Sequence, residues 1–515
     1  MRGELGQLAS SIGLSVQWRS QDEARASCPE REFWQRTTDL AQSVLLSDLF
    51  ATTADGSAAT LTAVLQMVGD PAWLLLSTEL SGTSFPSLTP AIHAASWYER
   101  EIFEMHGLEP VGHPAAAPLR LHDWPDDYPP MSGPQPGPGP VPRYPFDVIR
   151  PAVMGQGVFT LPLGPVRSGP QESAEFLFAS GGEDIVMVSL RLGYKFRAIE
   201  RLAQGRSADL ALPLAERLAG LSAFANGLAF TRAVERAVGA AVSPAAEHTR
   251  TLLAEIERLH SHFGTIARLC EATGLLVAAA QYGLLKEEVL RIGGRLTGHR
   301  YLRGALRIGG VEAVPTATLR GDLRSLAADW SARSERLQRL LAETSIFVDR
   351  LETTAVLTPD YAAEHNLVGP VGRASGQDRD ARRDHPYAAY GALRLTVPTA
   401  LDGDAEARLQ VLVAEVQQSL AIVDDLFDSW PAESGQTGPP ALRAGSALGW
   451  AEAPGGETLH FVDLDETGAV RRWRARPPAV VNWHPFAHAC GSGNNLTDYP
   501  VIEASFSLSH AEFDR

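Results

Sequence analysis

A tract rich in proline and glycine, PPMSGPQPGPGPVPRYP at residues 129–145, interrupts the first third of the sequence. Such a tract has almost no apolar side chains to bury and favours extended, polyproline-like conformations. It cannot bury enough surface to become ordered by itself. The sequence therefore predicts a folded unit at 1–128, a linker at 129–150 and a second folded unit at 151–515.

The first unit shows the hydrophobic pattern of a mixed α/β domain. Residues 60–67, TLTAVLQM, alternate apolar and polar side chains as a half-buried strand does. Residues 72–77, AWLLLS, form a short apolar run that suits an interior strand.

The second unit changes from short strands to long helices. Strands are expected at 158–165, 175–179 and 184–190. Apolar residues then recur every three or four positions, which predicts helices through 214–221, 252–270, 323–340 and 409–427. The expected fold class is α+β: an N-terminal α/β domain joined to a mainly α-helical bundle with small β-sheets, where a cofactor would lie between facing helices.

Charge and cysteine content exclude several classes of function. Acidic residues number 61 against 45 lysines and arginines, a net charge of −16, whereas nucleic-acid binding depends on a basic face. We therefore expect no nucleic-acid partner. The three cysteines, Cys28, Cys270 and Cys490, lie too far apart for a disulfide framework or an iron–sulfur motif. No signal peptide or membrane-spanning stretch is evident, so a cytoplasmic location is expected.

Six segments in order along the chain carry a family resemblance. They include the stretch RLGYKFRAIERLAQGR at 191–206 and the segment VGPVGRASGQDRDARRDHPYAAY at 368–390. This half resembles large subunits of nickel–iron hydrogenases and the 49-kDa-type subunit of complex I. The segment SWYEREIFEMHG at 96–107 resembles the 30-kDa-type subunit of complex I. The fusion of both resembles group 4 membrane-bound hydrogenases of the formate-hydrogenlyase type. The remaining matching segments are 161–178, 286–311 and 449–462.

The departures from this family concentrate at the positions of the nickel ligands. Where the resemblance implies two Cys-x-x-Cys pairs, the chain has Ala219 with Ser222, and Ser509 with Glu512. Gly455 also replaces a customary arginine. Nickel–iron chemistry uses soft thiolate ligands, whereas these side chains offer no sulfur. We expect no metal bound by this chain.

A quinone site like that of complex I is the alternative, and it departs from its pattern as well. The resemblance implies a histidine in the Gly-Pro loop and a tyrosine near the first ligand position. Arg167 and Gly220 stand at those places. A quinone therefore remains an alternative ligand of a rearranged pocket.

Several polar residues survive as candidates for chemistry. Glu172 matches the carboxylate thought to pass protons in the resembling hydrogenases, and burial in a partly dry cleft would raise its pKa toward neutrality. The alternative is a solvated glutamate of a surface loop. Arg373, Asp380 and Arg382 either line the same cavity or form a structural ion-pair network. His484, His488 and Cys490 have helical metal-ligand spacing, but Pro485 and the missing fourth ligand favour a core or surface role.

These observations lead to two hypotheses. The first is a subunit of a membrane-associated oxidoreductase complex that couples electron transfer to ion translocation. The resemblance implies an iron–sulfur small subunit with an adjacent 4Fe-4S cluster as a partner, together with antiporter-like and anchor subunits in the membrane. The chain would then lie on the inner face of the cell membrane. The second hypothesis is a non-catalytic scaffold, and a subunit of an NADH-quinone oxidoreductase with an altered quinone pocket is a third.

Overall fold

A computed structural model describes residues 3–53, 58–125, 128–132, 153, 155–168, 171–432, 438–491 and 493–515. The expected linker at 129–150 lies outside these residues except for its first four. Those four are not extended away from the fold, because Met131 is buried against Met105 and Leu121 and its N–H donates to the Met105 carbonyl (2.9 Å). The start of the tract therefore packs on the N-terminal part.

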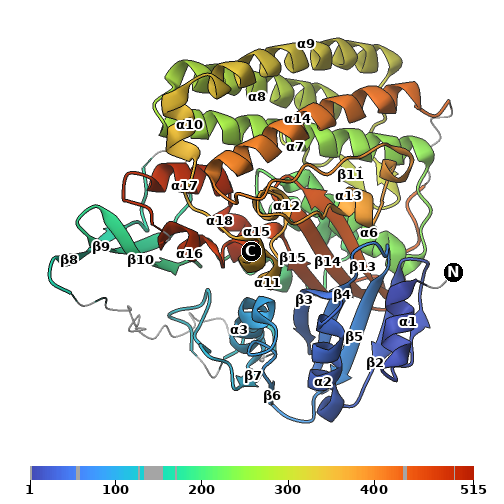
Figure 1. The fold of residues 1–515 in the computed structure, drawn as a ribbon. Coiled ribbons are helices and arrows are strands. Elements are labelled where there is room, and N and C mark those ends of the chain that lie inside the picture. The colour runs from blue at the N-terminus through green and yellow to red at the C-terminus, as the bar shows by residue number, and fades with distance from the viewer. Residues whose placement is uncertain are drawn as a thin grey trace.

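The N-terminal part is built on a five-stranded sheet, in which the two predicted strands are β4 and β5. The strand at 60–67 was expected to be half-buried, but β4 is buried on both faces because the second part of the chain covers the sheet. The strand order is β1-β2-β5-β4-β3, with β2 and β5 parallel and the other neighbours antiparallel. Helices α1, α2 and α3 accompany the sheet, and β6 and β7 form a small parallel ladder (Figure 1). The bounds are α1 (Glu4–Ser11), β1 (Gln17–Trp18), β2 (Glu23–Ser27), α2 (Glu30–Ala41), β3 (Leu45–Thr52), β4 (Thr60–Gln66), β5 (Trp73–Glu79), β6 (Ser84–Pro86), α3 (Ser96–His106) and β7 (Glu109–Val111).

Long helices dominate the second part, confirming three of the helices predicted from periodicity. The helices α7, α8, α9 and α14 form the layer at the top of Figure 1. The three predicted strands before them form an antiparallel sheet of order β10-β9-β8. The bounds are β8 (Val158–Leu163), β9 (Glu175–Gly181), β10 (Asp184–Arg191), α7 (Pro244–Ala272), α8 (Leu276–Thr297), α9 (Ala317–Ala342) and α14 (Ala405–Asp428).

The prediction of a helix through 214–221 is wrong. Helix α5 ends at Ala215, and α6 begins at Ala223 with Ser222 as its N-cap residue. Leu218 is fully buried in the connection between them. The start of α6 is fixed from outside the segment, since Glu257 of α7 accepts hydrogen bonds from the N–H groups of Phe224 (2.6 Å) and Ala225 (2.9 Å).

An antiparallel sheet, β13-β14-β15, lies between the long helices and the N-terminal sheet (Figure 1). It was not predicted, and α6 packs against it. Short helices complete the chain. The remaining elements are α4 (Ile199–Ala203), α5 (Ala208–Ala215), α6 (Ala223–Val238), β11 (Leu306–Arg307), β12 (Gly310–Val311), α10 (Ser345–Leu351), α11 (Pro359–Glu364), α12 (Gly369–Arg373), α13 (Ala381–Asp384), β13 (Gly445–Ala453), β14 (Gly456–Leu464), β15 (Val470–Arg476), α15 (Pro478–Asn482), α16 (Phe486–Gly491), α17 (Tyr499–Phe506) and α18 (His510–Asp514).

The N-terminal sheet shares its core with the second part of the chain. Trp73 stacks on His385 with ring centroids 4.1 Å apart, and Phe50 lies 5.0 Å from Phe461. The opposite face of the sheet, with Leu74, packs in a core that also holds residues of the C-terminal helices. Within the described residues no helix is both long and apolar enough to cross a membrane.

Candidate functional site

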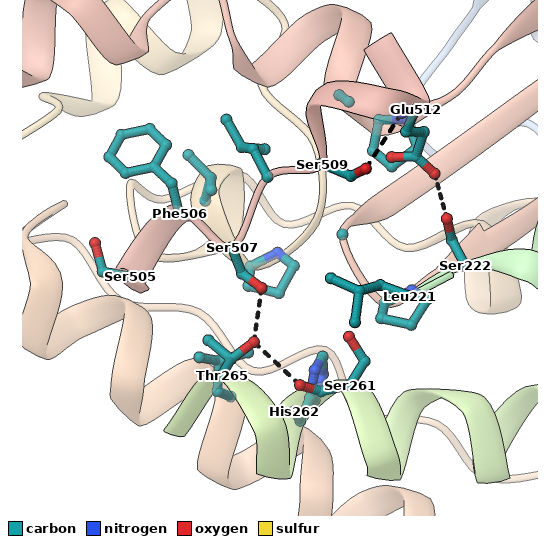
Figure 2. A pocket seen from close by; sticks show the side chains of 18 residues that line it. Leu221, Ser222, Ser261, His262, Thr265, Ser505, Phe506, Ser507, Ser509 and Glu512 are labelled. Atoms are coloured by element: carbon teal, nitrogen blue, oxygen red, sulfur yellow. Dashed lines mark hydrogen bonds between the residues drawn. The ribbon is translucent and has the colours of Figure 1, made fainter. Parts of the chain in front are cut away.

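A small cavity lies where the four departing ligand positions were expected to meet. Its volume is about 30 Å³, and hydroxyl groups from three separate segments line it. Figure 2 shows that these side chains come from the connection before α6, from α7, and from the end of α17 with the turn that follows it. A space of this size holds about two water molecules. The hydroxyl-bearing residues are Ser222, Ser261, Thr265, Ser505, Ser507 and Ser509.

Ser222 and Glu512 close one side of the cavity by bonding to each other. The Ser222 hydroxyl donates to the Glu512 carboxyl group (Figure 2). The Asn226 amide donates to the same oxygen (3.0 Å). The Asn226 carbonyl in turn accepts from Thr458 (2.9 Å) and lies 3.3 Å from His460 Nε2. Burial raises the pKa of Glu512, although Ser222 and Asn226 act against that rise.

Ser509 forms the adjoining wall and bonds to Glu172. Ser509 is the N-cap of α18, where its side chain accepts from the Glu512 N–H (3.2 Å). Its hydroxyl also lies 3.0 Å from a carboxylate oxygen of Glu172, and the Ala511 N–H donates to that oxygen (2.9 Å). Glu172 thus lies beside the cavity wall, in the loop before β9.

The raised pKa expected for Glu172 is wrong. Burial acts to raise it, but hydrogen bonds from His510, the Ala511 N–H and Ser509 favour the charged form and lower the pKa of Glu172 to about 2. The carboxylate is also only partly enclosed, with 34% of its side chain exposed. At neutral pH Glu172 is therefore ionised in this conformation.

The donor set at this site does not suit a nickel–iron group. Ala219 is buried and has no donor atom, while Ser222, Ser509 and Glu512 are engaged in hydrogen bonds with one another or with Glu172. Hard oxygen donors replace the soft thiolates that such chemistry uses. Among the residues that the structure describes, no cluster of three or more histidine, cysteine or acidic side chains is placed to hold a metal ion.

The cavity is also far smaller than a quinone-binding pocket, since ligand pockets usually enclose roughly 300 to 1,000 Å³. Arg167, at the place of the expected histidine, makes a two-pronged ion pair with Glu503 (2.5 and 2.7 Å). Gly220 has nothing within 4 Å of the position that a side chain would occupy. A quinone would need a conformation with a larger pocket.

Arg373, Asp380 and Arg382 form a buried ion-pair network rather than the wall of this cavity. Arg373 contacts Asp380 (3.1 Å), and Arg382 contacts Asp380 (2.7 Å). Asp380 is the N-cap of α13 and borders a second cavity. These contacts agree with the ion-pair network, which was one of the two alternatives predicted from the sequence.

His484, His488 and Cys490 do not converge on one point. His484 stacks on Trp97, His488 stacks on Tyr361, and Cys490 is buried in the core. Their helical spacing therefore serves packing.

The sequence reasoning missed the polar residues of α7. His262 lines the cavity, while Arg258 and Glu255 are fully buried one and two turns away, respectively. Charged side chains next to the apolar positions of a helix at 252–270 were a usable signal, because a helix that carries buried charges must meet partner charges on its neighbours.

Two known protein families match different parts of the chain. The family described as "Respiratory-chain NADH dehydrogenase, 30 Kd subunit" matches residues 30–139, and the family described as "Respiratory-chain NADH dehydrogenase, 49 Kd subunit" matches residues 273–443. Both halves of the resemblance found in the sequence are thus present in one chain.

Individual relatives cover most of the chain. Formate hydrogenlyase subunit 5 of Escherichia coli is 32% identical over 467 residues, which is 87% of this chain and 80% of that protein. Hydrogenase-4 component G of Escherichia coli is 32% identical over 474 residues, covering 88% and 80%. An NADH-quinone oxidoreductase subunit of Dehalococcoides mccartyi is 29% identical over 362 residues, covering 69% of this chain and 98% of that protein.

Proposed function

Because the chain belongs to the family in which complex I 30-kDa-type and 49-kDa-type domains are fused, as in formate hydrogenlyase subunit 5 and hydrogenase-4 component G, we propose that it is a subunit of a related oxidoreductase complex. In this proposal the complex couples electron transfer to ion translocation. The chain contributes no nickel–iron centre of its own.

One observation carries the proposal of a site without nickel. Ala219, Ser222, Ser509 and Glu512 occupy the ligand positions, and the last three bond to protein groups around a cavity of about 30 Å³. A pair of metal ions would require these side chains to release their partners and to coordinate through oxygen. That requirement weighs against nickel in this chain.

Glu172 is the group that we propose moves protons. Part of its side chain is exposed to solvent, and its carboxylate bonds to Ser509 at the cavity wall. Glu172 therefore lies between solvent and the cavity. The bonds from His510 and Ala511 hold it as a carboxylate, which accepts a proton when those bonds loosen. Proton uptake at Glu172 would therefore follow a rearrangement of the Ser509–Glu512 segment.

Partner subunits of the relatives' complexes complete the assembly that we propose. An iron–sulfur small subunit would face the cavity and hold the 4Fe-4S cluster, and antiporter-like and anchor subunits would hold the assembly to the membrane. The chain would lie on the cytoplasmic side, as a peripheral subunit. Residues 1–128 would act as the 30-kDa-type domain, 129–150 as the connection and 151–515 as the 49-kDa-type domain.

A second candidate function is a scaffold that only joins the other subunits. The low pKa of Glu172 and the small, hydrogen-bonded cavity favour it, since neither feature needs chemistry at the site. The two functions differ in whether the cavity side chains are needed for turnover. A quinone-reducing subunit stays the third alternative, and it needs the larger pocket described above.

Metal analysis of the complex purified with its native partners tests the absence of nickel. We expect iron in multiples of four and no nickel per copy of this chain. Stoichiometric nickel would overturn the proposed site.

Replacement of Glu172 tests the proton-handling role. Glu172→Gln keeps an oxygen that accepts from Ser509 and Ala511 but removes the titrating group. We expect turnover of the assembled complex to fall at least tenfold. Glu183→Gln, in the exposed turn between β9 and β10, is the matched control. Full turnover in Glu172→Gln would favour the scaffold.

A further inference from the structure

A second set of buried charges connects the hydroxyl-lined cavity with the junction between the two parts of the chain. His262 lines that cavity, and its Nε2 lies 2.8 Å from Glu415 of α14. The other oxygen of Glu415 lies 2.8 Å from Arg373. Arg373 also contacts Glu452 of β13 (3.0 Å). Besides Asp380, one guanidinium group therefore contacts Glu415 and Glu452, which lie toward opposite ends of the set.

The set carries more acidic than basic groups. Three guanidinium groups face four carboxyl groups, so the set has one net negative charge when all of them are ionised and His262 is neutral. All of them are almost completely buried, where an unbalanced charge is costly. One bound proton would balance the set. Its members are Arg258, Arg373, Arg382, Glu255, Asp380, Glu415 and Glu452.

Glu452 has a route to water that does not pass through the first cavity. It borders a second cavity of about 10 Å³, roughly one water molecule, at the contact between the N-terminal sheet and α13. Gln66 of β4 and His385 line the same space. Asp384, whose side chain is 15% exposed, forms its edge toward solvent.

We propose that Glu452 is a proton-loading residue whose proton occupancy is coupled to the hydroxyl-lined cavity through Glu415 and Arg373. A proton that reaches Glu415 by way of His262 neutralises one of the three carboxylates that contact Arg373. Burial acts to raise the pKa of Glu415, but Arg373, His262 and Arg258 hold it well below the usual range, so Glu415 keeps this proton only transiently. Arg373 then binds Glu452 more strongly, and Glu452 releases its proton toward Asp384. Arg373 itself gives up no proton in this exchange. The inference rests on the proposed function, since it gives the cavity a second proton-exchanging partner besides Glu172.

The groups that face Glu452 agree with a residue poised between its two protonation states. Burial and Asp380 favour the neutral form, whereas Arg373, Arg258 and Arg382 favour the charged form, and the pKa of Glu452 is raised to about 7. Arg379 and Glu457 border the same cavity. The Ala381 N–H donates to the second carboxyl oxygen (3.0 Å), and the Tyr387 hydroxyl accepts from the Glu452 N–H.

Infrared titration of the full chain purified with its partners tests the coupling directly. The titration is done in a Glu257→Gln background, because the pKa of Glu257 is also raised, to about 8. There we expect the carbonyl band of a protonated carboxyl group to disappear with a midpoint near neutral pH, and to be absent when Glu452→Gln is added. Glu415→Gln imitates the protonated state of Glu415, so the midpoint should fall by at least about one pH unit. If that variant does not fold, Arg373→Lys replaces it. A lysine cannot bridge both carboxyl groups, so the midpoint should rise.

Glu235→Gln is the matched control, because Glu235 belongs to a separate buried ion pair with Arg250 (2.6 Å). It should leave the midpoint unchanged. In the Glu257→Gln background, a neutral-pH band that persists after Glu452→Gln, or a midpoint that neither Glu415→Gln nor Arg373→Lys shifts, would overturn the inference. Turnover of Glu172→Gln is measured separately. If Glu172→Gln loses turnover but neither Glu415→Gln nor Arg373→Lys shifts the Glu452 midpoint, only this inference is contradicted. If Glu172→Gln keeps full turnover but those two variants shift the midpoint, only the role of Glu172 is contradicted.

Discussion

Glu101 of α3 joins the two parts of the chain through a single carboxylate. It contacts Arg120 (3.0 Å) from the N-terminal part, and Arg474 of β15 and Arg515 lie closer still. Burial acts to raise its pKa, but Arg120, Arg474 and Arg515 hold it well below the usual range. Glu101 therefore stays charged and balances a cluster of buried cations.

Removal of this charge should be costly. Glu101→Gln leaves the three guanidinium groups without their shared partner, and breaking a buried ion pair from one side costs about 3 to 5 kcal/mol. We expect a clearly lower unfolding temperature by calorimetry. Glu109→Gln in the exposed position of β7 should change stability by no more than about 0.5 kcal/mol. Equal unfolding temperatures for the two variants would contradict this account.

The sequence motifs identified which residues belong to the site, but they did not predict which residues those side chains bond to. Ser222, Ser509 and Glu512 were expected together, and they line one cavity. The bond between Ser222 and Glu512 joins residues 290 positions apart, and no local pattern encodes such a pair. The lowered pKa of Glu172 has the same origin, because its donors lie more than 330 residues away.

At the scale of elements, the contact between β13 and α6 depends on a glycine. A Cβ atom at Gly449 would lie 2.2 Å from the Ala229 carbonyl oxygen and 2.4 Å from the Ala233 nitrogen, both in α6. The strand therefore packs directly on the helix backbone. Gly449→Ala should destabilise the protein by at least about 1 to 3 kcal/mol, since neither element can move without disturbing the core.

Gly283 of α8 supplies the opposite case for the same substitution. Nothing lies within 4 Å of its Cβ position, and glycine inside a helix costs about 1 kcal/mol relative to alanine. Gly283→Ala should therefore raise the unfolding temperature while Gly449→Ala lowers it. Chemical denaturation of both variants measures the difference, and a neutral Gly449→Ala would contradict the close packing.

Elements were predictable where one side of them meets water or a long periodicity repeats. The strand at 184–190 and the helices α7, α9 and α14 have that character. The strand at 60–67 is buried on both faces, but its sequence still alternates apolar and polar side chains. The strand β13 is buried along most of its length on both faces, so it shows no alternation to detect. The break between α5 and α6 is set by Glu257, which no pattern within that segment reveals.

At the scale of the whole molecule, the linker tract suggested two separate cores, whereas the N-terminal sheet is buried on both faces. Trp73 packs against Trp450 across the junction, with ring centroids 5.8 Å apart. The proposed division into domains is thus compatible with a large shared interface, where many ionisable groups lose contact with water.

This burial should give stability a maximum near pH 6 to 7. Burial lowers the pKa values of His106, His260 and His460 to about 3, so the folded state binds fewer protons than the unfolded state below about pH 6.5, and stability falls as the pH falls. Burial raises the pKa of Glu257 to about 8. The folded state then binds more protons between about pH 4.5 and 8, and stability falls as the pH rises through that range.

Glu257→Gln isolates the alkaline side of this maximum. The amide imitates the neutral carboxyl group and keeps one accepting oxygen for the start of α6 at every pH, so the variant should lose less stability than the wild type between pH 6 and 8. The difference should be on the order of 1.4 kcal/mol per pH unit, as follows from one proton. Glu271→Gln, at an exposed position of the same helix, should follow the wild-type curve. Unfolding temperatures measured from pH 5 to 9 decide the matter, because parallel curves for Glu257→Gln and the wild type would mean that Glu257 is ionised in the folded protein.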